Sequence, residues 1–380
     1  MNITTANSQD WVHSYPSWAG IYPRYLIESR DKGYIFFTDY YNSGAIWHSI
    51  IVKTDINGNV LWHKTIGDGT HAFIAGSLEE TPDLGIILCG MTNKYGGVNP
   101  DPYMVKFNAC GELEWCSVNQ TPGIYDFAVR VKQTQSGDYI MLASMSDPNE
   151  YYRIQLYKIS SEGDWIWKHN YPPHPEVSND DGADLTLLDD GYLITALCYA
   201  PDSGQTEGGA YERLYYIRTD TMGDDVWRLV YGSSNGYHGQ AWFNTLKNPS
   251  GHFYTVGWHS NYCDTPGLIK VLSDGSESYF ADLMPTACPG GCGSLNFLDD
   301  TTFVILVGGT INGTRRLKWI KTDTLGAEKY FKEFPINDFM ESTGWTIVTH
   351  DKKIVGLSDY NLNITLYKLN SSCEFDTVYP

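Results

Sequence analysis

The sequence has little positive charge, few charged residues of either sign and no long apolar run. Only 19% of its 380 residues are Asp, Glu, Lys or Arg, and 45 acidic residues against 26 basic ones leave a net charge of −19. Nucleic-acid binding needs clustered Lys and Arg, so we expect no nucleic-acid partner. No stretch approaches the roughly 18 apolar residues of a membrane-spanning helix, so we expect no membrane insertion.

Signatures of common catalytic and cofactor sites are also missing. No Gly-x-Ser-x-Gly, P-loop, His-Glu-x-x-His or dinucleotide-binding pattern occurs. The Asp-rich turn at 55–59 lacks the later Glu of a calcium loop, and the eight cysteines show no paired Cys-x-x-Cys spacing typical of zinc. We therefore expect no metal and no cofactor, with calcium the one ion left open.

Aromatic residues and glycine are abundant instead. The chain holds 28 Tyr, 12 Trp and 37 Gly, and aromatic residues make up 14% of it. Aromatic residues favour strands, and glycine favours tight turns. This composition predicts a β protein with many turns and enough apolar surface to form a core.

A repeated unit of about 50 residues runs through the chain. A basic residue recurs, followed five positions later by Gly in six of seven copies and nine positions later by an aromatic residue in six of seven. The bases are Lys53, Lys106, Lys158, Arg218, Lys270, Lys321 and Lys368; the glycines are Gly58, Gly111, Gly163, Gly223, Gly275 and Gly326; the aromatics are Trp62, Trp115, Trp167, Trp227, Tyr279 and Tyr330. The pattern predicts a hairpin whose Gly takes a positive φ. It also predicts an aromatic that fills the gap between neighbouring sheets.

Two further strands precede each hairpin. An Asp/Gly turn introduces an apolar strand, as at 31–37 and 189–194, and another short strand comes before that turn. Four strands in about 50 residues are typical of a β-propeller blade. We therefore predict an all-β, seven-bladed β-propeller with four-stranded blades. The expected blades cover approximately residues 19–69, 70–121, 122–172, 181–233, 238–283, 291–335 and 341–373.

The two ends of the chain predict how the ring closes. The seventh unit has Cys373 and Thr377 where the others have Gly and an aromatic, while Trp11 has no unit of its own. We expect residues 10–16 to form the outermost strand of the last blade, which leaves only short, protected sheet edges. An open solenoid would leave Trp11 unexplained. Residues 374–380 are expected to be a tail, or the start of a C-terminal segment that is not present here.

These units resemble the propeller repeats of secreted Bacteroidetes proteins, many of which carry a C-terminal type IX secretion sorting domain. The resemblance rests on the "Lys-Thr-Asp, two residues, Gly, three residues, Trp" and "Asp-(x)-Gly-Tyr-Ile" patterns and covers nearly the whole chain. It implies a secreted or cell-surface location, although the sorting domain is absent and the polar start shows no signal peptide. Quinoprotein dehydrogenases also place Gly four residues before a Trp, but they bind a quinone under a vicinal Cys pair, which this chain lacks.

Candidate ligand-binding residues stand where the innermost strands begin. They are His71, Tyr125, Asp126, Asp181 and His238. Such positions tend to surround the mouth of a propeller's central channel, so these side chains would suit a polar ligand. The alternative is that they are ordinary solvated residues lining a wet channel.

Two cysteines, Cys288 and Cys292, flank Pro-Gly-Gly in a predicted loop. They could form a small disulfide or half of a metal site. Cys89 and Cys198 fall within apolar strands and are expected to be buried thiols.

Long loops gather on one face of the predicted propeller, and long loops commonly carry function. We therefore expect a binding or adhesion module that recognises a glycan or a surface protein through this face, with no catalytic residues assigned. The alternatives are a glycan lyase or hydrolase with its site at the channel mouth, and a structural scaffold of a surface assembly. We expect a monomer unless the chain is part of such an assembly.

Overall fold

The computed structural model describes residues 11–15, 22–41, 46–95, 99–121, 123–146, 152–173, 180–201, 210–231, 244–260, 264–283, 288–311, 314–335, 345–360 and 363–374. Regular structure in these residues is entirely β-strand. Within the same ranges there is accordingly no helix long and apolar enough to cross a membrane.

The described residues form 28 strands. In order they are β1 (Trp11–Tyr15), β2 (Tyr22–Glu28), β3 (Tyr34–Tyr41), β4 (Trp47–Thr54), β5 (Val60–Ile66), β6 (Phe73–Glu80), β7 (Ile86–Thr92), β8 (Asp101–Phe107), β9 (Leu113–Val118), β10 (Asp126–Gln133), β11 (Tyr139–Ser146), β12 (Tyr152–Ile159), β13 (Trp165–Asn170), β14 (Asp180–Leu188), β15 (Gly191–Pro201), β16 (Ala210–Thr219), β17 (Asp225–Val230), β18 (Thr245–Lys247), β19 (Phe253–Ser260), β20 (Asp264–Val271), β21 (Glu277–Asp282), β22 (Cys288–Asp299), β23 (Thr302–Ile311), β24 (Thr314–Asp323), β25 (Glu328–Pro335), β26 (Trp345–Val348), β27 (Ile354–Tyr360) and β28 (Asn363–Leu369).

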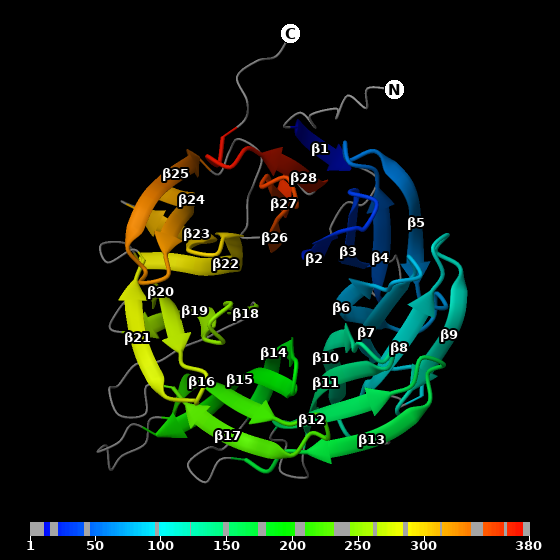
Figure 1. The fold of residues 1–380 in the computed structure, drawn as a ribbon. Coiled ribbons are helices and arrows are strands. Elements are labelled where there is room, and N and C mark those ends of the chain that lie inside the picture. Colours follow the sequence, from blue (N-terminus) through cyan, green and yellow to red (C-terminus); the bar gives the residue numbers. More distant parts are fainter. Residues whose placement is uncertain are drawn as a thin grey trace, which may run out of the picture.

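The strands group into antiparallel sheets arranged as a ring, with the first strand of each group nearest the centre (Figure 1). Five sheets have four strands: β10–β13, β14–β17, β18–β21, β22–β25, and β26–β28 together with β1. The remaining strands, β2–β9, form one eight-stranded sheet. The predicted all-β propeller is therefore confirmed.

The prediction of seven separate four-stranded blades needs a correction in the first part of the chain. The units β2–β5 and β6–β9 are joined by one parallel bridge pair, His48 of β4 opposite Phe73 of β6. Gly67, between the units, makes this close approach possible, because a Cβ atom there would lie 2.7 Å from His48 Nδ1. The described part thus has five separate four-stranded sheets and one fused sheet.

The ring is closed by the N-terminal strand, as the unpaired Trp11 predicted. β1 pairs antiparallel with β28, with Trp11 opposite Lys368 and Tyr15 opposite Ile364. Figure 1 shows blue β1 beside red β28. The Tyr15 hydroxyl also donates a 2.7 Å hydrogen bond to the Gly58 carbonyl in the next sheet. Ring closure thereby protects an edge of β28 that would otherwise be open. The tail from residue 375 lies outside the described residues.

The repeated glycines take the positive φ that the hairpin pattern predicted. Their φ angles lie between 73° and 92°, and Cys373 takes the same conformation in the seventh unit with a φ of 58°. The aromatic of the preceding outer strand lies against five of these turns. A Cβ atom would come within 2.8 Å of Trp11 at Gly58 and of Trp115 at Gly163. At Gly326 the close neighbour is Ala281 instead. The aromatics thus pack between neighbouring sheets.

The repeated base has a structural partner that the sequence pattern did not reveal. Lys53, Lys106, Lys158 and Lys368 lie 2.9–3.4 Å from the Asp of the first turn in their own unit, and Arg218 pairs in the same way with Asp190. Lys270 and Lys321 instead lie over tyrosine rings, 5.4–5.8 Å from their centroids. In five of the seven units the base therefore ties its strand to the first turn of the unit.

Candidate functional site

The predicted channel-mouth residues are distributed over three successive junctions between units. His71 lies in the β5–β6 loop, Tyr125 and Asp126 lie at the start of β10, and Asp181 is the second residue of β14. His238 lies outside the described residues. His71 Nδ1 is 2.9 Å from Asp68 Oδ2, while the Ser144 hydroxyl donates to Asp181 at 2.6 Å. Among the four predicted residues that the structure describes, His71 therefore lies with Asp68 and apart from the other three.

Tyr125 belongs to a small aromatic cluster. Its ring meets those of Phe127 and Tyr152 edge to face, with centroids 6.1 and 6.2 Å away. Burial, followed by the nearby Tyr125 and Asp181, raises the pKa of Tyr152. Tyr125 and Asp181 thus both lie close enough to Tyr152 to influence its pKa, but His71 is not part of this group.

Asp126 is buried against a second carboxylate, Asp101, which the sequence analysis did not single out. Asp101 is fully buried and Asp126 is 1% exposed, and the Thr121 hydroxyl lies 3.1 Å from Asp101 Oδ1 and 2.6 Å from Asp126 Oδ2. One hydroxyl proton cannot serve both acceptors. Burial raises the pKa of Asp126 to about 6, against the opposing Thr121 hydrogen bond and with help from Asp101. The pair is therefore suited to hold one proton.

Replacing Asp126 tests whether the Asp101–Asp126 pair holds one proton. The folded protein holds the Asp126 proton more tightly than the unfolded chain does, so the contribution of Asp126 to stability falls as pH rises from about 4 to about 6. We expect Asp126→Asn to be more stable than the parent above pH 6, by about 2 kcal/mol, with the gap closing below pH 4. Denaturant unfolding between pH 3.5 and 8 measures this.

The control for this prediction is Asp55→Asn. Despite partial burial, hydrogen bonds from Asn59 and Asn57 lower the pKa of Asp55. The sign should therefore reverse, and Asp55→Asn should lose stability relative to the parent as pH rises. A stability gap for Asp126→Asn that stays constant across the pH range would contradict the shared proton.

Arg130 of β10 contacts residues of the innermost strands of three other units. Its Nε lies 3.0 Å from Asp184 Oδ1 of β14, and its guanidinium lies 5.4 Å from the ring centroids of both Tyr25 and Trp345. A cavity of about 380 Å³ between the innermost strands lies beside this group and is lined by Tyr25, Asp184 and Trp345. The buried Arg130–Asp184 pair thus joins inner strands that are far apart in the sequence.

A groove of about 490 Å³ lies where β5 and its following loop face the next unit, β7–β9. We call it the Asp68 groove. Phe73, Val105 and Phe107 supply an apolar floor, and Asp68, Lys94, Tyr95 and Gln120 supply polar groups and an aromatic ring. Tyr95 is 51% exposed. The groove therefore combines an accessible aromatic surface with convergent polar side chains, as small-molecule sites do.

Asp68 organises the polar side of the groove. Its carboxylate accepts hydrogen bonds from the backbone N–H groups of Thr70 and His71 at 3.0 and 2.9 Å, and it lies 3.4 Å from Lys94 Nζ. Slight burial would raise the pKa of Asp68, but the hydrogen bonds from Thr70 and His71 outweigh it and hold that pKa well below its usual range. Asp68 is therefore ionised at any physiological pH.

Tyr103 lines the same groove and has an unused polar group. The side chain is fully buried, and its hydroxyl has no hydrogen-bond partner among the described residues. Burial raises the pKa of Tyr103 well above its usual value, so the phenol keeps its proton. The Tyr103 ring therefore belongs to the apolar floor of the groove, and its buried hydroxyl is not accessible to a ligand.

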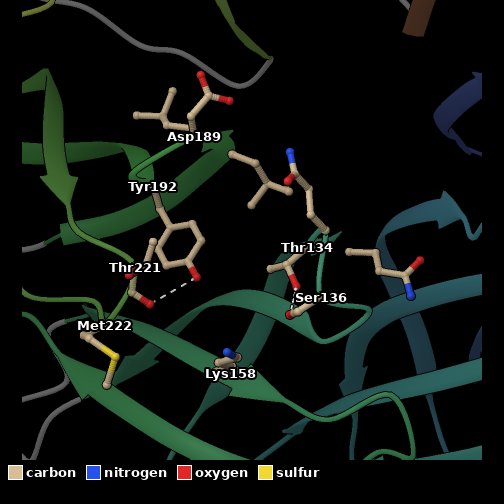
Figure 2. Close-up of a pocket in the computed structure, with 11 residues that line it drawn as sticks. Thr134, Ser136, Lys158, Asp189, Tyr192, Thr221 and Met222 are labelled. Carbon is tan, nitrogen blue, oxygen red and sulfur yellow. Dashed lines mark hydrogen bonds between the residues drawn. The ribbon is translucent and has the colours of Figure 1, made fainter.

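A second cleft, of about 400 Å³, contrasts with the Asp68 groove. Figure 2 shows it between the turns of β10–β11, β14–β15 and β16–β17, with Tyr192 and Met222 on one side and Lys158 below. Its polar groups already bind one another. The Tyr192 hydroxyl donates to the Thr221 carbonyl at 3.3 Å, and Lys158 lies 3.1 Å from Asp138. The cleft therefore offers a ligand fewer unpaired polar groups than the Asp68 groove does.

The sequence analysis found only the edge of the Asp68 groove, through His71. Lys94 and Tyr95 belong to a loop of the next unit, and nothing in the sequence placed that loop beside Asp68. The predicted Cys288–Cys292 disulfide stays untested, since both residues lie in β22 but their side chains are outside the described part. Cys89 and Cys198 are buried thiols, as predicted, and Cys110 and Cys116 are exposed thiols.

Comparison with known proteins finds similar folds among solved structures. No family model and no curated protein match the chain. Among solved structures, it is similar to a polysaccharide lyase, the PL25 ulvan lyase, with a TM-score of 0.60 at 11% identity over 94% of this chain and 96% of that one. The shared feature is the β-propeller fold.

Two further propellers are similar at the same level of identity. The GH93 α-L-arabinofuranosidase of Fusarium graminearum, solved with arabinobiose, has a TM-score of 0.52 at 12% identity, over 83% of this chain and 95% of the enzyme. The β-propeller domain of the Trilobed protease from Pyrococcus furiosus has 0.51 at 12%, over 93% and 95%. That domain is described as having an open velcro topology, whereas here β1 pairs with β28. At such identities these likenesses concern the fold alone.

Proposed function

We propose that the protein binds a glycan in the Asp68 groove. The observation that carries this proposal is the half-exposed Tyr95 ring beside a fixed carboxylate, over an apolar floor formed by Phe73, Val105 and Phe107. The C–H face of a sugar ring suits an aromatic surface, and its hydroxyls suit carboxylate, amide and phenol groups. That two similar propellers act on saccharides supports the proposal but does not carry it.

The rate at which the Cys116 thiol is alkylated can report whether a ligand occupies the groove. Cys116 lines the groove and is exposed, while Cys110 is exposed in the β8–β9 turn and does not line it. The purified chain would be mixed with cello-, xylo-, laminari- and α-1,5-arabino-hexaose in turn, alkylated with N-ethylmaleimide, and cut at Glu112 and Glu114 to separate the two cysteines. We expect a binding hexaose to slow alkylation of Cys116 about fivefold or more at saturation and to leave Cys110 unchanged.

Two variants locate the binding. Tyr95→Ala should weaken binding about tenfold through loss of the stacking surface. Met222→Ala, in the cleft of Figure 2, should leave the affinity unchanged. If no hexaose protects Cys116, or if Cys110 is protected equally, the glycan proposal fails, and a surface protein becomes the partner to seek.

The alternative function, a glycan lyase or hydrolase, has one observation in its favour. Asp126 has its pKa raised to about 6, which suits a general acid, and Asp101 stands beside it. Both carboxyls are nevertheless buried, and a catalytic acid must touch its substrate. We therefore favour binding without turnover. Products released on prolonged incubation, by hydrolysis of the same hexaoses or by elimination from a uronate hexamer, and lost in Asp126→Asn, would establish the enzyme instead.

Two finer points belong to the same proposal. We count the fused β2–β9 sheet as two blades, which makes the ring seven-bladed, because only the His48–Phe73 bridge pair joins its halves. The secreted or cell-surface location, and the resemblance to type IX secretion cargo, stay predictions from the sequence, as does the possibility of calcium binding.

A further inference from the structure

Resting on the proposed function, we infer that the Asp68 groove selects uncharged glycans and discriminates against uronates. Uronates carry a carboxylate on the sugar ring, so a site for them needs a cation that is free to pair with it. The charges that line the groove do not provide one.

Lys94 is the one positively charged residue among the described residues that line the groove. Its Nζ lies 3.4 Å from Asp68 Oδ2 and 5.6 Å from the centroid of the Tyr95 ring. His71, next to the groove, also directs its Nδ1 to Asp68, at 2.9 Å. The Lys94 ammonium and the His71 imidazole therefore both face the same carboxylate.

Asp68 keeps its charge at all relevant pH values, because its hydrogen bonds from Thr70 and His71 favour the ionised form. With Lys94 paired, the groove offers a bound sugar no net positive charge. The whole chain adds to this effect, since its net charge of −19 repels a polyanion at a distance. Like charges brought together in a site weaken binding strongly.

The remaining polar groups suit hydroxyls. The exposed Gln120 amide can donate and accept, and the phenol of the half-exposed Tyr95 can do the same. Tyr95 provides a stacking surface that does not depend on ligand charge. The groove therefore has what a neutral sugar needs.

The test compares neutral and acidic hexasaccharides in the Cys116 protection assay. The neutral set is the four hexaoses above together with the fully methyl-esterified galacturonate hexamer. The acidic set is the galacturonate, mannuronate and glucuronate hexamers. We expect the tightest neutral ligand to bind at least about tenfold more tightly than the tightest acidic one. Raising the salt from 50 to 500 mM should narrow the difference, because salt screens the repulsion.

Gln120→Lys adds a free cation to the groove and should bring uronate binding to within about threefold of neutral binding. Gln120 is exposed, so this variant is expected to fold. The matched control, Gln135→Lys, adds the same charge at the cleft of Figure 2 and should change neither affinity.

The outcomes separate this inference from the proposed function. If no hexasaccharide of either set protects Cys116, glycan binding itself fails. If an acidic hexamer binds as tightly as the best neutral one in the unmodified protein, glycan binding stands and the charge selectivity is wrong. A Gln120→Lys variant that gains no uronate affinity would also contradict the electrostatic explanation.

Discussion

Arg130→Ala lowers the free energy of unfolding by about 3–5 kcal/mol, because it leaves Asp184 as a buried charge without its ion-pair partner. Both side chains of this pair are 7% exposed, and the guanidinium also donates to the Val129 carbonyl at 3.1 Å. Asp184 would keep one hydrogen bond, from the Thr245 N–H at 2.6 Å. Urea unfolding of the variant and the parent at pH 7 gives the difference.

The same substitution removes a contact between strands on different sides of the ring. Arg130 lies over Tyr25 of β2 and Trp345 of β26, and cation–π contacts are worth more when they are desolvated. Arg130→Met, which restores apolar volume but leaves Asp184 unpaired, should recover only part of the loss.

The control for Arg130 is Lys332→Ala. Lys332 is paired with Glu374 at 2.9 Å, but both side chains are about 40% exposed, so we expect a loss below about 1 kcal/mol. A loss for Arg130→Ala no larger than that for Lys332→Ala would show that the central pair does not hold the ring together.

Removal of residues 1–15 opens the ring and should cost more than about 4 kcal/mol of stability. The five residue pairs between β1 and β28 disappear, and so does the Tyr15 hydrogen bond to Gly58. The edge of β28 is then left with unpaired backbone groups. Thermal unfolding followed by tryptophan fluorescence measures the effect, and a synthetic peptide of residues 1–20 should restore stability in proportion to its concentration.

Point variants keep this prediction testable if the truncated chain does not fold. Trp11→Ala removes the ring that covers the Gly58 turn and should cost about 2 kcal/mol, less than a fully buried Trp because Trp11 is partly exposed. Val12→Ala, on the exposed side of the same strand, should stay within about 0.5 kcal/mol. Equal effects of the two substitutions, or no response to the peptide, would contradict closure by β1.

Local pattern was enough to predict the unit. The spacing of base, glycine and aromatic specified a hairpin with a positive-φ turn, and Gly58 and Gly163 have φ angles of 83° and 92°. The missing aromatic at residue 377 and the extra Trp11 predicted that the chain ends meet, and β1 pairs with β28. These features follow from residues within one hairpin, or from counting units along the chain.

The Asp68 groove could not be found in this way. Asp68 and Lys94 are 3.4 Å apart in the structure, but they belong to different units and neither is part of the repeat. Asp101 and Asp126 likewise meet only through the β9–β10 loop, at Thr121. Nothing in the sequence around Arg130 indicates its ion pair, since its partner Asp184 is 54 residues away.

The repeating hairpin and the β-propeller could be predicted from turn chemistry repeated along the chain, and the closing strand from counting the units. The tertiary structure decided where charges from neighbouring units meet: at the Asp68 groove, at the Asp101–Asp126 pair and across the ring at Arg130. The physical reason is that these contacts depend on how adjacent sheets pack and on which loops face each other. A periodic sequence specifies each unit but not the side chains that its neighbour presents to it.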